Sequence, residues 1–435
     1  MRRLICWGGA AVVAAFAALA ITEAPLGTPL FFAFAAVPAV VYGLLMRRLL
    51  APSQPKAQGF GPERLLRIAL LLAVAFRVPV AVAPVGADND MVRYMYDGRL
   101  QQLGINPYTV VPADPAIAWT HTDLTRRMPS IRARTPYPAA AQLFFRLVVT
   151  IRETPRAMKL ALVACDLLTI LVLVRWLRQT NRPPWLALAY AWNPLVILEV
   201  AHSGHIDALG ALWIALAAWM LTTGRTLRGA IAFVMAIATK LLPIVLVPLL
   251  WKRIRIRDAA AGGLVWVLLY LPFRSAGALP LGAVPNVVAF IRFNGPLFKW
   301  LAELATPQVA AAVAVVAGLS VATWMRFSRP ADDPAAWAWP MAVSLAAAPV
   351  IYPWYLLYFT PFLFSAATVP LIAWTYAALP VYLVWYLSKF GHRWFVPTPV
   401  LWIEFGAVVL VLLGRIVAVR PVISSVRRRS RPRSA

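Results

Sequence analysis

The chain has 435 residues, of which 61% are hydrophobic and only 13% are charged. Soluble domains carry about 25% charged residues, so this composition excludes an ordinary soluble protein. The formal net charge is +26, and the basic residues stand in short clusters between apolar blocks. A nucleic-acid-binding protein gathers its basic residues on one folded face, so nucleic acid is not an expected partner.

The apolar blocks are about 20 residues long, which is the length of helix that crosses a bilayer core. They predict an all-α fold, a polytopic bundle of about 12–14 transmembrane helices, in one membrane domain over residues 1–420. The first block also resembles a signal peptide, but a second span follows directly, so we expect a retained helix. The expected spans are 4–22, 29–46, 66–86, 157–175, 185–201, 206–222, 228–239, 241–251, 259–273, 307–325, 335–351, 354–367, 369–387 and 398–416.

Basic clusters orient these spans, because Lys and Arg accumulate in cytoplasmic loops. The clusters lie at 2–3, 47–48, 175–182 and 252–257 and in the tail 421–435. They predict cytoplasmic termini, with a first external loop at 87–156 and a second at 274–306. The basic tail also suits contact with anionic membrane lipids.

The apolar run 228–250 conflicts with this orientation, because a single span there would move the cluster 252–257 to the outside. Lys240 and Pro243 interrupt the run. Proline breaks a helix, and neighbouring helices can satisfy the freed backbone groups. We therefore expect two short helices with an outward apex. A lysine at such a depth is costly unless it reaches water or an anion, so Lys240 either snorkels to the interface or binds a phosphate.

Two carboxylates, Asp88 and Asp90, directly follow the third span. Carboxylates at a membrane boundary are costly to bury and tend to be functional where they face a cavity. The structural alternative is that Asp88 or Asn89 caps a helix that runs to about Leu103. Both roles can hold together, with one side chain capping and the other pointing into a cavity.

The helix after this cap is expected to be amphipathic and to lie on the outer surface beside the spans. Met91, Tyr94 and Met95 form its apolar face, and Arg93, Asp97 and Gln101 share the other face. Arg93 and Asp97 are four residues apart and can form an ion pair. Gly104 ends the helix, and the following Asn106-Pro107 starts a turn.

Three short motifs in this loop resemble a known family. They are Asp90-x-x-Arg93-Tyr94-x-x-Asp97-Gly98, then Gly104-Ile105-Asn106-Pro107-Tyr108, then Tyr137-Pro138-x-x-x-Gln142-Leu143-Phe144. With them, residues 87–145 resemble the GT-C membrane glycosyltransferases. The similarity is to bacterial polyprenol-phosphate-mannose-dependent mannosyltransferases and to the catalytic subunit of glycosylphosphatidylinositol mannosyltransferase I. The rest of the chain fits as a hydropathy pattern, together with the segment 192–207. One departure is Ala139, where the family has a second proline.

The resemblance implies transfer of a sugar, expected to be mannose, from a polyprenyl-phosphate donor to a hydroxyl of a lipid or glycan acceptor on the extracytoplasmic face. It also implies an acidic catalytic base in the first external loop. Asp90 matches that residue best, and Asp88 is the reserve. A carboxylate can take the proton of an acceptor hydroxyl, and a single base opposite the leaving group suits inversion. The leaving phosphate needs cations rather than protonation. No metal or other cofactor is expected.

A wider set of polar residues is predicted to bind donor or acceptor. His202, His205 and Asp207 have a spacing that suits a metal, but a third firm ligand is missing, so sugar binding or helix capping is expected, with Glu199 nearby. Arg292 binds donor phosphate or is a solvated loop charge. The full set is Arg93, Tyr94, Asp97, Tyr108, Tyr137, Gln142, His202, His205, Asp207, Lys240, Arg292 and Asn294.

The aromatic cluster at 352–355 either anchors the chain at the interface or stacks on sugar. The rival function is a multi-span lipid or glycolipid transporter or flippase. Transporters often show inverted repeats with corresponding broken helices, and only one broken pair is expected here. A non-catalytic scaffold would leave Lys240 and the two carboxylates unexplained.

Overall fold

The computed structural model describes residues 1–51, 63–84, 89–275 and 282–429, with side chains up to Arg415. Over these residues the fold is all-helical, as predicted, and an isolated β-bridge joins Phe293 to Val350. Eight helices are long and apolar enough to cross a membrane. They are η1–α1 (Leu4–Thr22), α2 (Pro29–Leu49), α3 (Glu63–Val82), α6 (Pro155–Gln179), α11–η7 (Ile256–Phe273), α14 (Pro307–Ser328), the run from η10 to α17 (Ala366–Ser388) and the first part of α18 (Thr398–Arg415).

A ninth span forms if a bent pair is counted as one, namely Pro184–Ala191 and Pro194–His202, which meet at 52°. Over the described residues this count is lower than the predicted 12–14 spans, because several expected spans are short or irregular. Two are the short helices α9 (Asp207–Thr222) and α10 (Thr226–Thr239). The run 335–351 yields only α15 (Pro334–Ala346), and 241–251 and 354–367 form the 3₁₀ segments η6 (Leu242–Leu250), η8 (Pro353–Tyr358) and η9 (Thr360–Phe362). Proline lies in each 3₁₀ segment, where it removes a backbone donor and breaks the α-helical pattern.

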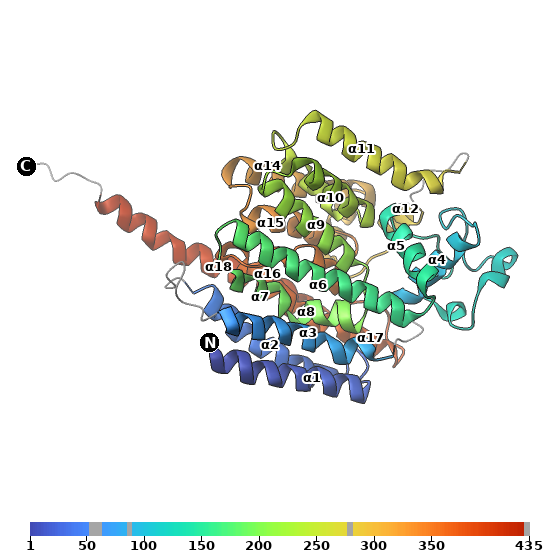
Figure 1. The fold of residues 1–435 in the computed structure, drawn as a ribbon, viewed down its shortest axis with the longest axis horizontal. Helices are drawn as coiled ribbons and strands as arrows, with labels where there is room; N and C mark the ends of the chain where they lie inside the picture. Colours follow the sequence, from blue (N-terminus) through green and yellow to red (C-terminus); the bar gives the residue numbers. More distant parts are fainter. Residues whose placement is uncertain (52–62, 85–88, 276–281, 430–435) are drawn as a thin grey trace, which may run out of the picture.

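The bundle places the first loop and the chain ends far apart. In Figure 1, α1, α2 and α3 lie along one edge and α11 along the opposite edge, with α6, α9 and α10 between them. Helices α4 (Asp90–Gln102), α5 (Ala139–Ile151) and α12 (Val284–Phe290) gather at one end of the molecule. The N-terminus and the far part of α18, which continues to Arg429 through part of the predicted basic tail, lie at the other end.

Helix α4 has the predicted position and ends. The Asn89 side chain accepts from the Met91 backbone N–H at 2.8 Å, so Asn89 is the cap, and Asp88 lies outside the described residues. Gly104 follows the helix with a φ of +74°, the left-handed conformation that ends many helices. Both faces of α4 are buried, because Val92, Tyr96 and Leu100 pack against the following loop around Met128, and α5, which the sequence analysis left within the loop, also packs on α4. Gly98 permits this contact, because a Cβ there would lie 2.7 Å from the Phe145 carbonyl oxygen.

A buried ion pair that the sequence analysis did not single out joins three elements of the bundle. Arg77 on α3 pairs with Asp166 on α6, and their side chains are 1% and 0% exposed. Arg77 also donates to the carbonyl oxygens of Ala73 at 2.6 Å and of Ala191, on α7 (Leu188–Ala191), at 3.0 Å. The charge is therefore fully hydrogen-bonded inside an apolar core, which a buried charge requires.

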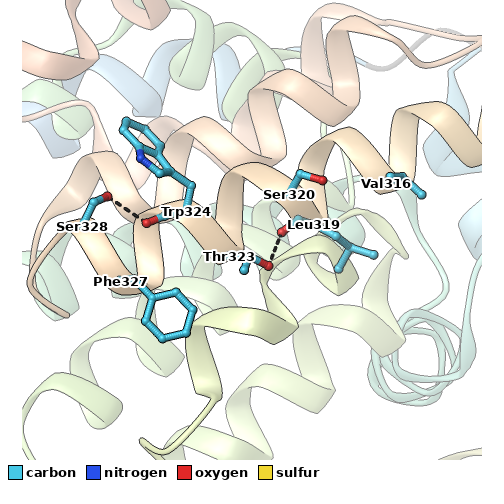
Figure 2. A pocket seen from close by; sticks show the side chains of 7 residues that line it. All are labelled: Val316, Leu319, Ser320, Thr323, Trp324, Phe327 and Ser328. Atoms are coloured by element: carbon cyan, nitrogen blue, oxygen red, sulfur yellow. Dashed lines mark hydrogen bonds between the residues drawn. The ribbon is translucent and has the colours of Figure 1, made fainter.

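A shallow groove runs along the outer face of α14 (Figure 2). Val316, Leu319, Trp324 and Phe327 give it an apolar lining. Two of its hydroxyls donate within the helix, Thr323 to the Leu319 carbonyl and Ser328 to the Trp324 carbonyl, each at 2.8 Å. No ionisable side chain lines this groove, so it suits contact with lipid rather than chemistry.

Candidate functional site

A cavity of about 750 Å³ lies at the α4 end of the bundle. Several candidates that are far apart in the sequence line its wall together, namely Asp90, Tyr94, Tyr137, His205, Asp207 and Lys240. Val287, Val288 and Ile291 from the region of α12 form an apolar part of the wall. Such a concave site, mostly apolar with a few convergent polar groups, is typical of a ligand-binding pocket.

Asp90 is the first residue of α4 and lies on the cavity wall. The Asn89 cap holds this turn in place, and the Asn89 amide donates to the Ser203 carbonyl oxygen at 2.9 Å. The Asp90 side chain is 30% exposed. Burial raises the pKa of Asp90 to about 6, and the nearby charge of Lys240 opposes this rise. A carboxyl group with a pKa close to neutral pH is suited to accept a proton.

Lys240 and Asp207 form an ion pair in the same wall. Lys240 lies in extended backbone between α10 and η6, so the predicted break in this apolar run is confirmed. Its ammonium group is 2.6 Å from the Asp207 carboxylate and 3.6 Å from the centre of the Tyr355 ring. Asp207 thus neutralises much of the Lys240 charge, while the second Asp207 oxygen has no hydrogen-bond partner among the described residues.

His205 lies between two carboxylates. Its Nδ1 is 3.8 Å from Asp90 Oδ2, and its Nε2 is 3.3 Å from the buried Glu199. The Tyr382 hydroxyl donates to the other Glu199 oxygen. The imidazole stacks on Trp354, with ring centres 3.9 Å apart and planes 7° apart. The adjacent Gly204 has a φ of +72°, and a Cβ there would overlap Met91 of α4, so only glycine allows this loop so close to α4.

A second group of candidates lies behind the cavity wall, in a network that ties segment 130–142 to α4. Arg93 donates to Asp97 at 2.8 Å, as predicted, and to the carbonyl oxygens of Ser130 and Ala133. Gln142 donates to the second Asp97 oxygen at 2.9 Å. Another candidate, Tyr108, donates to the Tyr137 carbonyl oxygen at 2.7 Å. These side chains support the wall and do not line the cavity themselves.

Arg292, Asn294 and His202 are not among the lining residues. The Arg292 guanidinium donates to the carbonyl oxygens of Val288, Ala289 and Ile291, at the end of its own helix. Asn294 donates to Glu404 at 2.9 Å, and His202 contacts Ser203. The structure therefore does not bring these three candidates to the cavity.

The wall contains further polar and aromatic residues that the sequence analysis missed, and most come from the C-terminal part of the chain. They are Tyr382, Trp385, Lys389 and Trp394. Each lies in or just after an expected span, where tyrosine, tryptophan and lysine are common interface residues. No local signal distinguished them. The described residues contain no group of three or more His, Cys, Asp or Glu placed to hold a metal ion.

A family profile described as "Alpha-(1->6)-mannopyranosyltransferase, N-terminal domain" matches residues 8–254, more than half of the chain. The chain belongs to this mannosyltransferase family. It is therefore a hexosyltransferase with multiple apolar membrane helices, and the resemblance to membrane mannosyltransferases is confirmed. No curated protein and no solved structure matches the chain.

The residues that the mannosyltransferase profile matches form only part of the cavity lining. Asp90, His205, Asp207 and Lys240 fall within the matched residues. The wall around Tyr382 and Lys389 lies beyond them. Residues before and after the end of the matched N-terminal domain therefore line the same cavity.

Proposed function

We propose that this mannosyltransferase transfers mannose from a polyprenyl-phosphate donor to a hydroxyl of a lipid or glycan acceptor, with Asp90 as the catalytic base. The observation that carries the proposal is the position of Asp90. Its carboxylate, with a pKa of about 6, faces a cavity that also contains lysines and an apolar wall. Transfer from a lipid-linked sugar phosphate needs all three features. The carboxylate deprotonates the acceptor, the lysines bind the phosphate, and the apolar wall holds the prenyl chain.

The proposed reaction is a single displacement. Asp90 takes the hydroxyl proton of the acceptor while the acceptor oxygen bonds to the anomeric carbon of mannose. The bond from that carbon to the phosphate oxygen breaks, and the lipid phosphate leaves with the electron pair. One base on the side of attack gives inversion. An α-linked product, as the family description names, then requires a β-linked donor.

Two lysines are proposed to bind the leaving phosphate. Lys240 lies deep in the wall and shares its charge with Asp207. Lys389 also lines the cavity, and no ion pair or side-chain hydrogen bond joins it to any described residue. Arg292 is engaged by the end of α12, so Lys389 takes the role that the sequence analysis gave to Arg292. Phosphate binding by lysine is a point-charge interaction that tolerates this loose geometry.

Lys389→Gln should raise the KM for the donor about 10-fold, because a hydrogen bond to a charged group is lost. The KM for the acceptor should not change. Lys299→Gln is the matched control, since Lys299 lies on α13 (Pro296–Leu304) with 74% of its side chain exposed and does not line the cavity. Steady-state kinetics with varied donor would measure both. An unchanged donor KM in Lys389→Gln would remove Lys389 from the phosphate site.

The donor class can be tested with the purified, full-length protein. We expect transfer of labelled mannose from polyprenyl-phosphate-mannose to a glycolipid acceptor, and no transfer from nucleotide-linked mannose. Use of the nucleotide sugar, with no use of the lipid-linked one, would contradict the proposal.

The proposed orientation places the cavity on the extracytoplasmic face of a bacterial inner membrane. Ala116→Cys, at an exposed position in the first loop, should react with a membrane-impermeant thiol reagent in intact cells. Arg228→Cys, at the start of α10, should react only after the membrane is opened. Both are made with Cys6 replaced by serine, because Cys6 is exposed. The reverse labelling pattern would invert the orientation.

A further inference from the structure

Behind Asp90 lies a row of titratable side chains to which the displacement itself gives no task. His205 Nδ1 is 3.8 Å from Asp90, His205 Nε2 is 3.3 Å from Glu199, and the Tyr382 hydroxyl donates to Glu199. These residues come from separate parts of the chain and converge on the cavity wall. A purely structural core would not need a carboxylate in this apolar setting, where its burial is costly.

The hydrogen bonding of this row is incomplete at two points. The buried Glu199 Oε2 has no hydrogen-bond partner among the described residues, so its approach to His205 Nε2 at 3.3 Å is a close contact and not a formed hydrogen bond. His205 Nδ1 is buried and has no hydrogen-bond partner among the described residues. If the Nε2–H faces Glu199, then Nδ1 carries a lone pair that points toward Asp90. An ionised Asp90 has no proton to offer that lone pair. A protonated Asp90 has one, and closing the gap of 3.8 Å by about 1 Å would form a hydrogen bond.

We propose that His205 is a positioning residue that raises the proton affinity of Asp90 by accepting a hydrogen bond from the carboxyl group after it takes the acceptor proton. A small rotation of the Glu199 carboxylate lets it accept from His205 Nε2–H, which selects the tautomer, and Tyr382 holds Glu199 in place. This inference rests on the proposed function, with Asp90 as the base. The proton moves once, from the acceptor hydroxyl to Asp90, and remains there until the product leaves. The hydrogen bond exists only after proton transfer, so it favours the transition state over the ground state.

The surrounding groups keep the imidazole neutral, as this role requires. The titratable groups around His205 are Asp90 on α4, Glu199 and His202 on η5 (Ile197–His202), Asp207 on α9, Lys240 before η6, Tyr355 and Tyr358 on η8 and Tyr382 on η11 (Leu379–Tyr382). Burial and the positive charge of Lys240 lower the pKa of His205 well below its usual value. The stack on Trp354 fixes the plane of the ring, so the lone pair keeps its direction.

Two substitutions, each by a side chain of similar size to the original, test this role through the pH profile of kcat/KM in the full-length enzyme. His205→Phe keeps an aromatic ring on Trp354 but removes the lone pair. Glu199→Gln offers an amide N–H to Nε2 and so favours the other tautomer, in which Nδ1–H donates to the Asp90 carboxylate. Both variants should lower kcat about 10-fold. Both should also move the acid limb of the profile, expected near pH 6, to lower pH by about one unit, because protonated Asp90 loses its acceptor. The KM for the donor should stay unchanged.

His121→Phe is the matched control. His121 is also a stacked histidine, with its ring centre 4.4 Å from that of Tyr96, but it does not line the cavity. Its substitution should leave the acid limb in place. A structural role for His205 would lower kcat without moving the limb, so an unmoved limb in both test variants overturns the proposal. If His205→Phe does not fold, Glu199→Gln alone decides. Absence of transfer by the wild-type enzyme would instead refute the proposed function, before any variant is compared.

Discussion

Asp90→Asn should lower mannosyl turnover about 100-fold or more, because the amide cannot accept the proton of the acceptor hydroxyl. The fold should survive, since Asn89 caps α4 and the Asp90 side chain forms no hydrogen bond with any described residue. Donor binding should also survive, because the proposed phosphate contacts are Lys240 and Lys389. Single-turnover transfer and a separate donor-binding assay would show both effects.

The pH dependence of the wild-type enzyme gives the same test without a mutation. Because the base acts only when ionised and its pKa is raised to about 6, transfer should fall as the pH drops below about 6.

Asp88→Asn, a substitution outside the described residues, is the control for Asp90→Asn and should lower turnover less. Normal turnover in Asp90→Asn with an inactive Asp88→Asn would move the base by two positions. Full activity in both variants would exclude the loop carboxylates as the base.

Arg77→Met should lower the free energy of unfolding by about 3–5 kcal/mol, because it leaves the Asp166 carboxylate buried without its partner. The double variant Arg77→Met with Asp166→Leu should recover most of this loss, since it removes both charges together. Unfolding in detergent, followed by temperature or denaturant, would measure the three proteins.

Arg178→Met is the comparison for this effect. It breaks the ion pair with Glu63, in which the side chains of Arg178 and Glu63 are 54% and 49% exposed. The free energy of unfolding should fall by less than about 1 kcal/mol. Equal losses in Arg77→Met and Arg178→Met would show that burial of the Arg77 pair contributes nothing special to stability.

The long helices could be predicted from the sequence because length and hydropathy are local properties. The eight helices that can span a membrane correspond to expected spans, with ends that differ by a few residues. The irregular segments could not be predicted in this way. The break at Lys240 and Pro243 was predictable from those two residues, but the 3₁₀ form of the segment after it was not. Around Pro361 the apolar composition is the same as in a span, and the irregular backbone there depends on packing by neighbours.

The candidate site was predictable where a polar residue stands out from its local setting. Asp90, Asp207 and Lys240 interrupt or border apolar runs, and the structure brings them to one cavity. The hydrogen bond between Tyr382 and Glu199 joins positions 183 residues apart, and no local sequence pattern indicates this contact. Arg292 shows the converse, because a loop arginine that looked free to bind phosphate folds back onto its own helix end.

The most direct test of the account is a cryo-EM structure of the Asp90→Asn variant with polyprenyl-phosphate-mannose bound. We expect the mannosyl phosphate inside the 750 Å³ cavity, with the phosphate beside Lys240 and Lys389 and the anomeric carbon facing position 90. A donor bound outside this cavity, or one whose anomeric carbon faces away from position 90, would contradict the account.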